Sequence, residues 1–143
     1  MTRNEFRDRV YKTFISEWTN GVLYTFDNEK FDPPNPQDPA VVRAGTVWVR
    51  LSVRHGDSQQ KTLGAVGQRK FEHEARIILQ IFTVPDTGLK SSDELAQLFF
   101  EIFDEDMGRN DVFGGASAYR ERGTAEGWQM SEAWVDYTYD ETR

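Results

Sequence analysis

The sequence predicts a single α+β domain: a mainly antiparallel sheet of about four strands with two helices packed on one side. Three observations predict this class. Two segments carry the apolar repeat of an amphipathic helix, others alternate apolar and polar residues, and each helix precedes a pair of extended segments. The chain has 143 residues, near the commonest domain size, so we expect residues 1–143 to form one domain with one core.

The first predicted helix runs from Asn4 to Trp18. Its apolar side chains recur at steps of three and four residues, which is the repeat of one helix face. They are Phe6, Val10, Tyr11, Phe14, Ile15 and Trp18. Asn20 and Gly21 follow, and both residue types tolerate the left-handed conformation that ends a helix.

Residues 27–44 are predicted to form a proline-rich strap. The short segment before it, from Val22 to Phe26, is rich in residues that favour strands. Four of the five prolines of the chain then fall between Pro33 and Pro39. Because proline fixes φ and has no backbone N–H, this stretch should run extended over the surface and stay out of the sheet interior.

Two strands with alternating patterns follow the strap. From Thr46 to Arg54, valines and a leucine occupy one face and polar residues the other, with Trp48 on the polar face. The alternation recurs from Phe71 to Thr83, where Ile78 and Phe82 interrupt it. We expect these two side chains to lie under a strap or helix, or at a subunit contact.

A long loop, residues 55–70, is predicted to join these strands as an antiparallel pair. It contains three glycines and three glutamines, which favour a flexible connection. Loops of this length in compact domains are usually disordered or functional. We therefore expect this loop to be mobile in the free subunit and to become ordered against a partner.

The second predicted helix begins at Ser91, because a serine followed three residues later by Glu94 forms a capping box. Gly108 is expected to end it. Between Ser91 and Met107 the chain holds six carboxylates and no Lys or Arg, so one surface of this helix should be acidic. The residues of its apolar stripe are Leu95, Leu98, Phe99, Ile102 and Phe103.

Two further extended segments, Tyr119 to Arg122 and Trp128 to Tyr139, complete the predicted sheet. The second segment alternates, with Ala133, Val135, Tyr137 and Tyr139 on one face. The residues from Gly123 to Gly127 between the two segments are predicted to form a hairpin connection.

Composition excludes several classes of function. The chain has no cysteine, which removes disulfide scaffolds, thiol catalysis and zinc sites that need sulfur. Its net charge of −7 opposes sequence-specific DNA binding by a basic face. No apolar run approaches the roughly 20 residues of a membrane span, and the polar start of the chain is unlike a signal peptide. We expect a soluble protein that begins in the cytosol and binds no membrane.

No pattern in the sequence predicts catalysis, and we expect the protein not to be an enzyme. The two histidines, His55 and His73, have no evident partner in sequence, and a lone strand histidine is most often a packing residue. The segment from Gly64 to Gly67 lacks the Gly-Lys-Ser/Thr ending of a phosphate loop and leads into a strand. The sequence therefore predicts no catalytic residues, cofactor or metal.

An excess of aromatic residues predicts an assembly interface. More large aromatics occur than one small core needs, and exposed aromatics beside arginines are typical of interfaces. Basic residues at the two ends of the predicted loop add positive charge that suits an acidic partner surface. The candidate interface consists of Trp48, Arg54, Arg69, Lys70, Phe82, Trp128 and Trp134.

Several motifs stand in an order that resembles the tail terminator proteins of long-tailed bacteriophages and prophages. No motif is diagnostic alone, and the similarity lies in their order and spacing over most of the chain. The motifs are Leu23-Tyr24 through Asp27-Asn28 and Phe31, Pro33-Pro34, Trp48-Val49-Arg50-Leu51-Ser52-Val53, Gly67-Gln68-Arg69-Lys70-Phe71, Ile77 to Pro85, Gly88, and Trp128-Gln129 with Val135, Tyr137 and Tyr139 before Asp140-Glu141.

The resemblance implies a subunit that assembles as a ring, generally a hexamer, on the head-proximal end of the tail tube. Such a ring stops tube polymerisation and offers the docking surface for the head connector. The implied partners are further copies of the chain, the tail tube protein and the head connector or stopper protein. DNA would pass through the ring without sequence-specific binding, which suits an acidic subunit. The implied location is the head-tail junction of the virion, after assembly in the host cytoplasm.

Two rival functions stay open. Another head-tail junction protein, an adaptor or a stopper, would share the ring and would differ in its binding partner. A small-ligand-binding α+β module would use the aromatics to line a pocket, and it predicts a monomer.

Overall fold

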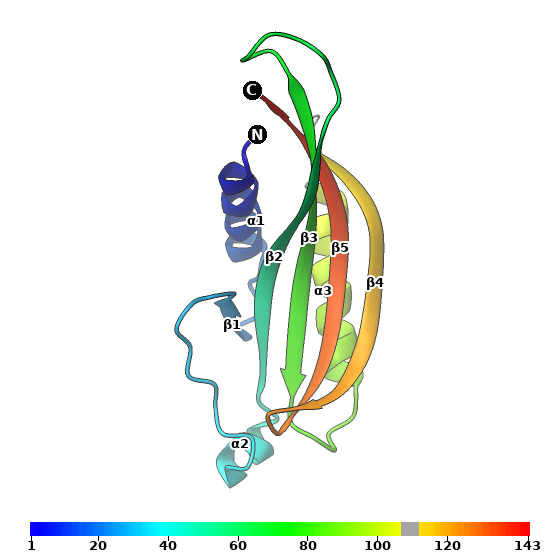
Figure 1. Cartoon of the computed structure of the whole chain (residues 1–143). Coiled ribbons are helices and arrows are strands. Elements are labelled where there is room, and N and C mark those ends of the chain that lie inside the picture. Colours follow the sequence, from blue (N-terminus) through cyan, green and yellow to red (C-terminus); the bar gives the residue numbers. More distant parts are fainter. Residues whose placement is uncertain (107–111) are drawn as a thin grey trace.

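The computed structural model describes residues 1–106 and 112–143 and shows an α+β fold, as the sequence predicts (Figure 1). Its sheet has the strand order β1-β2-β3-β5-β4, and neighbouring strands are antiparallel except for β1 and β2. The elements are α1 (Arg3–Glu17), β1 (Leu23–Phe26), α2 (Pro39–Ala44), β2 (Val47–Gln60), β3 (Lys70–Thr83), α3 (Lys90–Asp106), β4 (Val112–Ala125) and β5 (Trp128–Thr142).

The sheet differs from the predicted one at its edge. The described residues form five strands and three helices, where the sequence predicted about four antiparallel strands and two helices. β1 is a short parallel edge strand that pairs Leu23 with Trp48 and Phe26 with Leu51. Parallel neighbours need a crossover connection. Residues 27–46 supply it, and the predicted strap is therefore the crossover that makes the sheet mixed.

The strap contains a helix that its proline content concealed. The Asp38 side chain caps α2 by accepting a hydrogen bond from the Ala40 N–H (2.9 Å), and Pro39 is the first residue of the helix. Proline suits this position because its missing N–H would have no partner inside the helix. Gly45 ends α2 in the left-handed conformation, with φ of 61°. The strap is thus partly helical and not extended throughout.

The hairpin of β2 and β3 is longer than predicted, and its loop is shorter. Residues 55–60 belong to β2, so the connection is residues 61–69 and the predicted loop of 55–70 is wrong in its first part. The register shifts between His55 and Ser58, which is the irregularity that admits Gly56 into a strand. We call the connection, residues 61–69, the hairpin tip. It projects past the two long helices, at the top of Figure 1.

The two long helices confirm their predicted segments with corrections at particular residues. Thr2 caps α1 in a capping box with Glu5. Ile15 was expected on the apolar face of α1, but its side chain is 52% exposed. α3 begins one residue before Ser91, so the predicted serine cap lies inside the first turn. Gly108, the predicted end of α3, falls outside the described residues.

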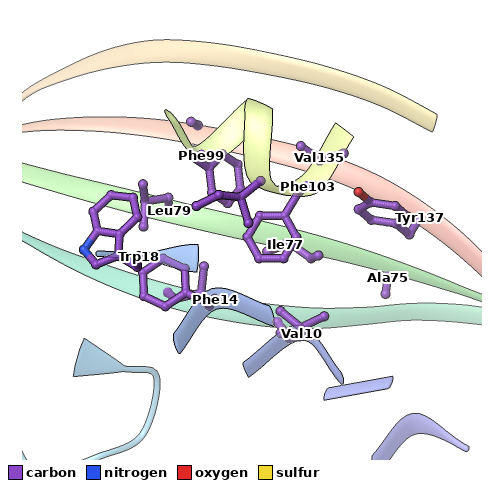
Figure 2. Packing of buried hydrophobic residues seen from close by; sticks show 14 of the residues in the cluster. Val10, Phe14, Trp18, Ala75, Ile77, Leu79, Phe99, Phe103, Val135 and Tyr137 are labelled. Carbon is purple, nitrogen blue, oxygen red and sulfur yellow. The ribbon is translucent and has the colours of Figure 1, made fainter. Parts of the chain in front are cut away.

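The hydrophobic core lies on the sheet face that α1 and α3 cover, which we call the core face. In Figure 2, Phe14 of α1, Trp18 directly after it, and Phe99 and Phe103 of α3 point toward the strands. Phe6 of α1 stacks on Tyr139 of β5, with ring centroids 4.5 Å apart. The strand residues that complete this core are Val49, Leu51, Val53, Ala75, Ile77, Leu79, Ile81, Val112, Ala133, Val135, Tyr137 and Tyr139.

Candidate functional site

The opposite side of the sheet, which we call the outer face, carries most of the predicted interface residues. Successive residues of a strand point to alternate faces. Since Val135 of β5 and Ile77 of β3 belong to the core, their neighbours Trp134 and Ile78 lie on the outer face. In Figure 1 the outer face of β3 and β5 is turned toward the viewer, with α3 behind it.

One end of the outer face is covered by the strap and forms a second small core. Trp48 stacks on Phe82 with ring centroids 4.0 Å apart, and Trp128 meets Trp48 edge-on at 6.1 Å. Phe31 of the strap lies 5.0 Å from the Trp48 ring. We call this region the covered end. It consists of Trp48, Phe82, Val84 and Trp128, with Phe31, Val41 and Met130 packed against them.

The predicted exposure of three interface residues is therefore wrong. Trp48, Phe82 and Trp128 are buried within the subunit. The expectation that Phe82 lies under a strap, a helix or a subunit contact is met by the strap. Phe31, an aromatic residue within the proline-rich strap, is the sequence signal that could have indicated this cover. Sequence spacing alone did not show which strands the strap crosses.

The middle of the outer face is open, and Trp134 is the aromatic residue at its centre. The guanidinium carbons of Arg76, Arg120 and Arg122 lie 5.0, 5.3 and 6.0 Å from the centroid of the Trp134 ring. These distances suit cation–π contacts. Trp134 belongs to neither hydrophobic cluster of the described residues and is half-buried beside its cross-strand neighbour Ile78. We call Trp134 and these three arginines the arginine–tryptophan patch.

Two ion pairs hold two of the three arginines of the patch in place, Arg76 and Arg122. Arg76 donates two hydrogen bonds to the Asp136 carboxylate, at 2.7 and 3.1 Å, and these raise the pKa of the Arg76 guanidinium. Arg122 pairs with Glu132 at 3.0 Å. Arg120 is exposed and forms no ion pair with a described residue. The patch therefore presents positive charge around an apolar ring.

The three basic residues predicted at the loop ends occupy different places. Arg54 lies opposite Arg76 in the strand register and pairs with Asp27 at 3.4 Å, so it borders the patch. Lys70 is exposed at the start of β3, six positions from Arg76, which is about 20 Å along a strand. Arg69 is half-buried and its backbone pairs with that of Arg143. The structure places Arg54 beside Arg76 of the patch, and Lys70 away from it.

The hairpin tip, part of the loop that the sequence predicts to become ordered against a partner, carries two exposed apolar side chains that were not predicted to take part. Leu63 and Val66 are 96% and 83% exposed, the most exposed large apolar side chains described. Arg69 and Lys70 stand beside them at the base of the tip. Exposed apolar residues on a projecting loop are typical of a docking element.

A hollow of about 460 Å³ adjoins the patch where small residues stand in the sheet. Gly56, Gly114 and Gly115 contribute no side chain there, while Arg54, Glu74, Arg76 and Asp136 supply charge. A Cβ on Gly115 would lie 3.2 Å from the Asp136 carbonyl oxygen, a tight contact, so glycine allows β4 to approach β5 closely here. The lining is more charged than that of most small-molecule pockets.

His73 has partners that its sequence position did not reveal. The His73 Nδ1 lies 2.5 Å from the Ser58 Oγ and the His73 Nε2 lies 2.5 Å from a Glu141 carboxylate oxygen. The Arg3 guanidinium donates a hydrogen bond to the same Ser58 oxygen (2.7 Å). The order Ser–His–Glu is that of a hydrolase triad. Here, however, the Ser58 oxygen accepts a hydrogen bond from the Arg3 guanidinium at the start of α1. These hydrogen bonds connect α1 to β2, β3 and β5.

His55 sits on the core face and is neutral at ordinary pH. Burial, followed by the nearby Arg7 charge, lowers the pKa of His55 to about 4. Its Nδ1 lies 3.3 Å from the Tyr139 hydroxyl, and burial raises the pKa of Tyr139 to about 12. Neither residue has a charged partner that would make it an acid or a base at neutral pH. The pair is therefore best interpreted as packing.

Comparisons with known proteins provide no family: no protein-family model matches the chain, and no curated protein matches it by sequence. Within residues 1–106 and 112–143, no cluster of three or more His, Asp or Glu side chains is arranged to hold a metal ion. None of the described helices has the length and apolar character that crossing a bilayer requires.

Proposed function

We propose that the chain is a structural subunit that assembles through the outer face of its sheet. The observation that carries this proposal is the arginine–tryptophan patch: a large aromatic side chain, ringed by three arginines, on the part of the outer face that the strap leaves open. Trp and Arg are the residues most enriched at the energetic centres of protein interfaces. A half-buried Trp134 in this setting suits a surface that a partner completes.

The particular assembly proposed is the ring that ends the tail tube of a long-tailed phage. The resemblance of the sequence motifs to tail terminator proteins is the reason for this choice. The hairpin tip supports it, because Leu63 and Val66 give a projecting apolar element that can contact the tail tube. The net charge of −7 suits a ring through which DNA must slide. The remaining face of the ring would dock the head connector or stopper.

The experiment combines light scattering with electron microscopy. Wild-type protein should form rings, either at high concentration or on the ends of purified tail tubes. Trp134→Ala should stay folded and lose the rings, and Ile15→Ala, which removes an exposed apolar residue from α1, serves as the matched control. A wild-type protein that stays monomeric and leaves tube ends bare would contradict the proposal. Rings that bind heads but not tubes would favour an adaptor or stopper.

The hollow beside the patch supports a second candidate function, that of a module binding a small ligand. Its charged lining, from Arg54, Glu74, Arg76 and Asp136, would select a polar, charged molecule. Gly56→Val would narrow this hollow, because a Cβ on Gly56 meets only ordinary contacts, the nearest at 3.5 Å from the Glu74 Cβ. If the chain is an assembly subunit, narrowing the hollow without disturbing Trp134 should leave ring formation intact, whereas a ligand-binding protein would be monomeric and would lose its ligand.

A further inference from the structure

The outer face and helix α3 carry opposite charges on opposite sides of the subunit. The open middle of the outer face holds five arginines against three carboxylates among the described residues. The arginines are Arg50, Arg54, Arg76, Arg120 and Arg122, and the carboxylates are Glu74, Glu132 and Asp136. This concentration of positive charge stands in a chain whose net charge is −7.

Helix α3 presents the opposite charge to solvent. Asp93, Glu94 and Glu101 are exposed on it, and the sequence from Ser91 to Met107 contains no Lys or Arg. Lys90 lies 3.9 Å from Glu94, and it is the basic residue that α3 contributes. The opposite side of α3 is committed to the core, where Phe99 and Phe103 pack on the sheet (Figure 2). The solvent side of α3 therefore carries three exposed carboxylates against one lysine among the side chains that the structure describes.

We infer that the arginine–tryptophan patch of one copy docks on the acidic surface of α3 in the next copy. The inference rests on the proposed assembly function and names the two surfaces that meet. Charge complementarity favours this partner, because the patch needs carboxylates that its own subunit does not supply to Arg120. Helix α3 of an identical copy supplies such carboxylates, and every copy of the chain carries both surfaces.

The placement of the two surfaces determines the kind of assembly. Trp134 points away from the core face, on which α3 packs, so the two surfaces of one copy cannot meet each other. Contact between different surfaces of identical copies is head-to-tail, and such contacts close into a ring when the rotation allows. A two-fold dimer, in which one patch meets an identical patch, would instead bring like charges together.

Reciprocal charge reversal tests the inference. The sheet variant combines Arg120→Glu with Arg122→Glu, and the helix variant combines Glu94→Arg with Glu101→Arg; all four side chains are exposed. Each variant alone should lose at least about tenfold in association, because its two docking surfaces then repel each other. An equimolar mixture should recover assembly, since each reversed surface finds its complement on the other variant.

Two controls change the net charge equally without touching either surface. Lys12→Glu with Lys30→Glu matches the sheet variant, and Asp8→Arg with Glu17→Arg matches the helix variant. Both controls should assemble as the wild type does. Circular dichroism and melting of every variant show whether it is folded.

A covalent readout completes the test. The natural chain has no cysteine, so Arg120→Cys with Glu101→Cys introduces the only thiols. Oxidation should link different copies into a ladder of oligomers, because the two positions of one copy lie on opposite sides of the sheet and cannot be bridged.

The outcomes separate the inference from the proposed function. If the wild type assembles and either variant assembles equally well, or if the mixture does not recover assembly, the inference is overturned while the assembly function stands. If the wild type neither self-associates nor decorates tail tubes, the proposed function fails as well.

Discussion

The covered end and the open middle of the outer face use the same kind of residue for opposite purposes. Trp48 and Trp134 both stand on the outer faces of their strands, and an arginine lies over each ring, Arg50 at 5.4 Å and Arg76 at 5.0 Å. The strap packs Phe31 and Val41 over the first tryptophan and leaves the second open. An aromatic residue on a sheet face therefore becomes core or interface according to what the chain lays over it.

The largest expected effect is that of Trp48→Ala. Removing a buried tryptophan should lower the free energy of unfolding by about 3–5 kcal/mol, because it leaves a cavity among Phe82, Trp128 and Phe31. Trp134→Ala should cost well under half as much, since its ring is partly in solvent. Urea denaturation of the two variants checks the difference. Equal losses would show that the patch is part of the core and not an open surface.

Gly127→Ala measures how tightly the strap contacts the turn between β4 and β5. Gly127 has φ of 82°, and an added Cβ would lie 3.0 Å from the Pro36 side chain. Gly123→Ala is the matched control, because its φ is 87° and a Cβ there meets nothing within 4 Å. Both changes should cost about 1–2 kcal/mol from the left-handed backbone, and Gly127→Ala somewhat more. If Gly123→Ala is the more damaging, the strap does not press on this turn.

Acid should destabilise the fold through His55. Its folded pKa of about 4 lies below the unfolded value of 6.5, so the unfolded chain binds the proton first as pH falls. The stability that neutral His55 contributes is therefore complete above pH 6.5 and is lost as the pH falls from 6.5 toward 4. Urea midpoints at pH 7.5 and 4.5 should differ more for the wild type than for His55→Gln. If the two urea midpoints differ by the same amount in the wild type and in His55→Gln, His55 does not titrate in this range.

The smallest effect on stability is expected at the hairpin tip. Leu63→Ser with Val66→Ser should change the free energy of unfolding by less than about 0.5 kcal/mol, because both side chains are almost fully exposed. The same variant should lose binding to tail tubes in a sedimentation assay, if the tip is the docking element. Thr62→Ser at the base of the tip is a control that keeps both apolar residues. Full binding by the double variant would place the tube contact elsewhere.

The sequence predicted the local elements well where one periodicity dominated. The helical repeats of α1 and α3 and the alternation in β3 and β5 were found within a few residues of their true bounds, whereas β2 extends beyond the predicted Arg54 to Gln60 and β4 is longer than the predicted Tyr119–Arg122. The errors came from residues whose local signal opposed the tertiary environment. Gly56 was predicted to lie in a loop, but it lies in β2 at a bulge. The prolines of the strap favoured an extended segment, and α2 was therefore not predicted.

The candidate site was predicted only in part. Trp134 and Arg54 were named from the sequence and lie on the open face, but Arg76, Arg120 and Arg122 were not recognised as their neighbours. These arginines come from β3 and β4, and strand pairing alone brings them to one ring. The partners of His73 were missed for the same reason, because Ser58 and Glu141 are 15 and 68 positions away.

The sequence by itself determined the two long helices, the alternating strands, the acidic character of α3 and the lack of cysteine, because each depends on residue type and on spacing within one segment. Only the tertiary structure decided which face of the sheet stays open. The path of the strap, set by the parallel pairing of β1 with β2 and by its packing on Trp48, covers one end of the outer face and leaves Trp134 half-buried on the open middle. Long-range packing is a property of several segments together, and no single segment encodes it.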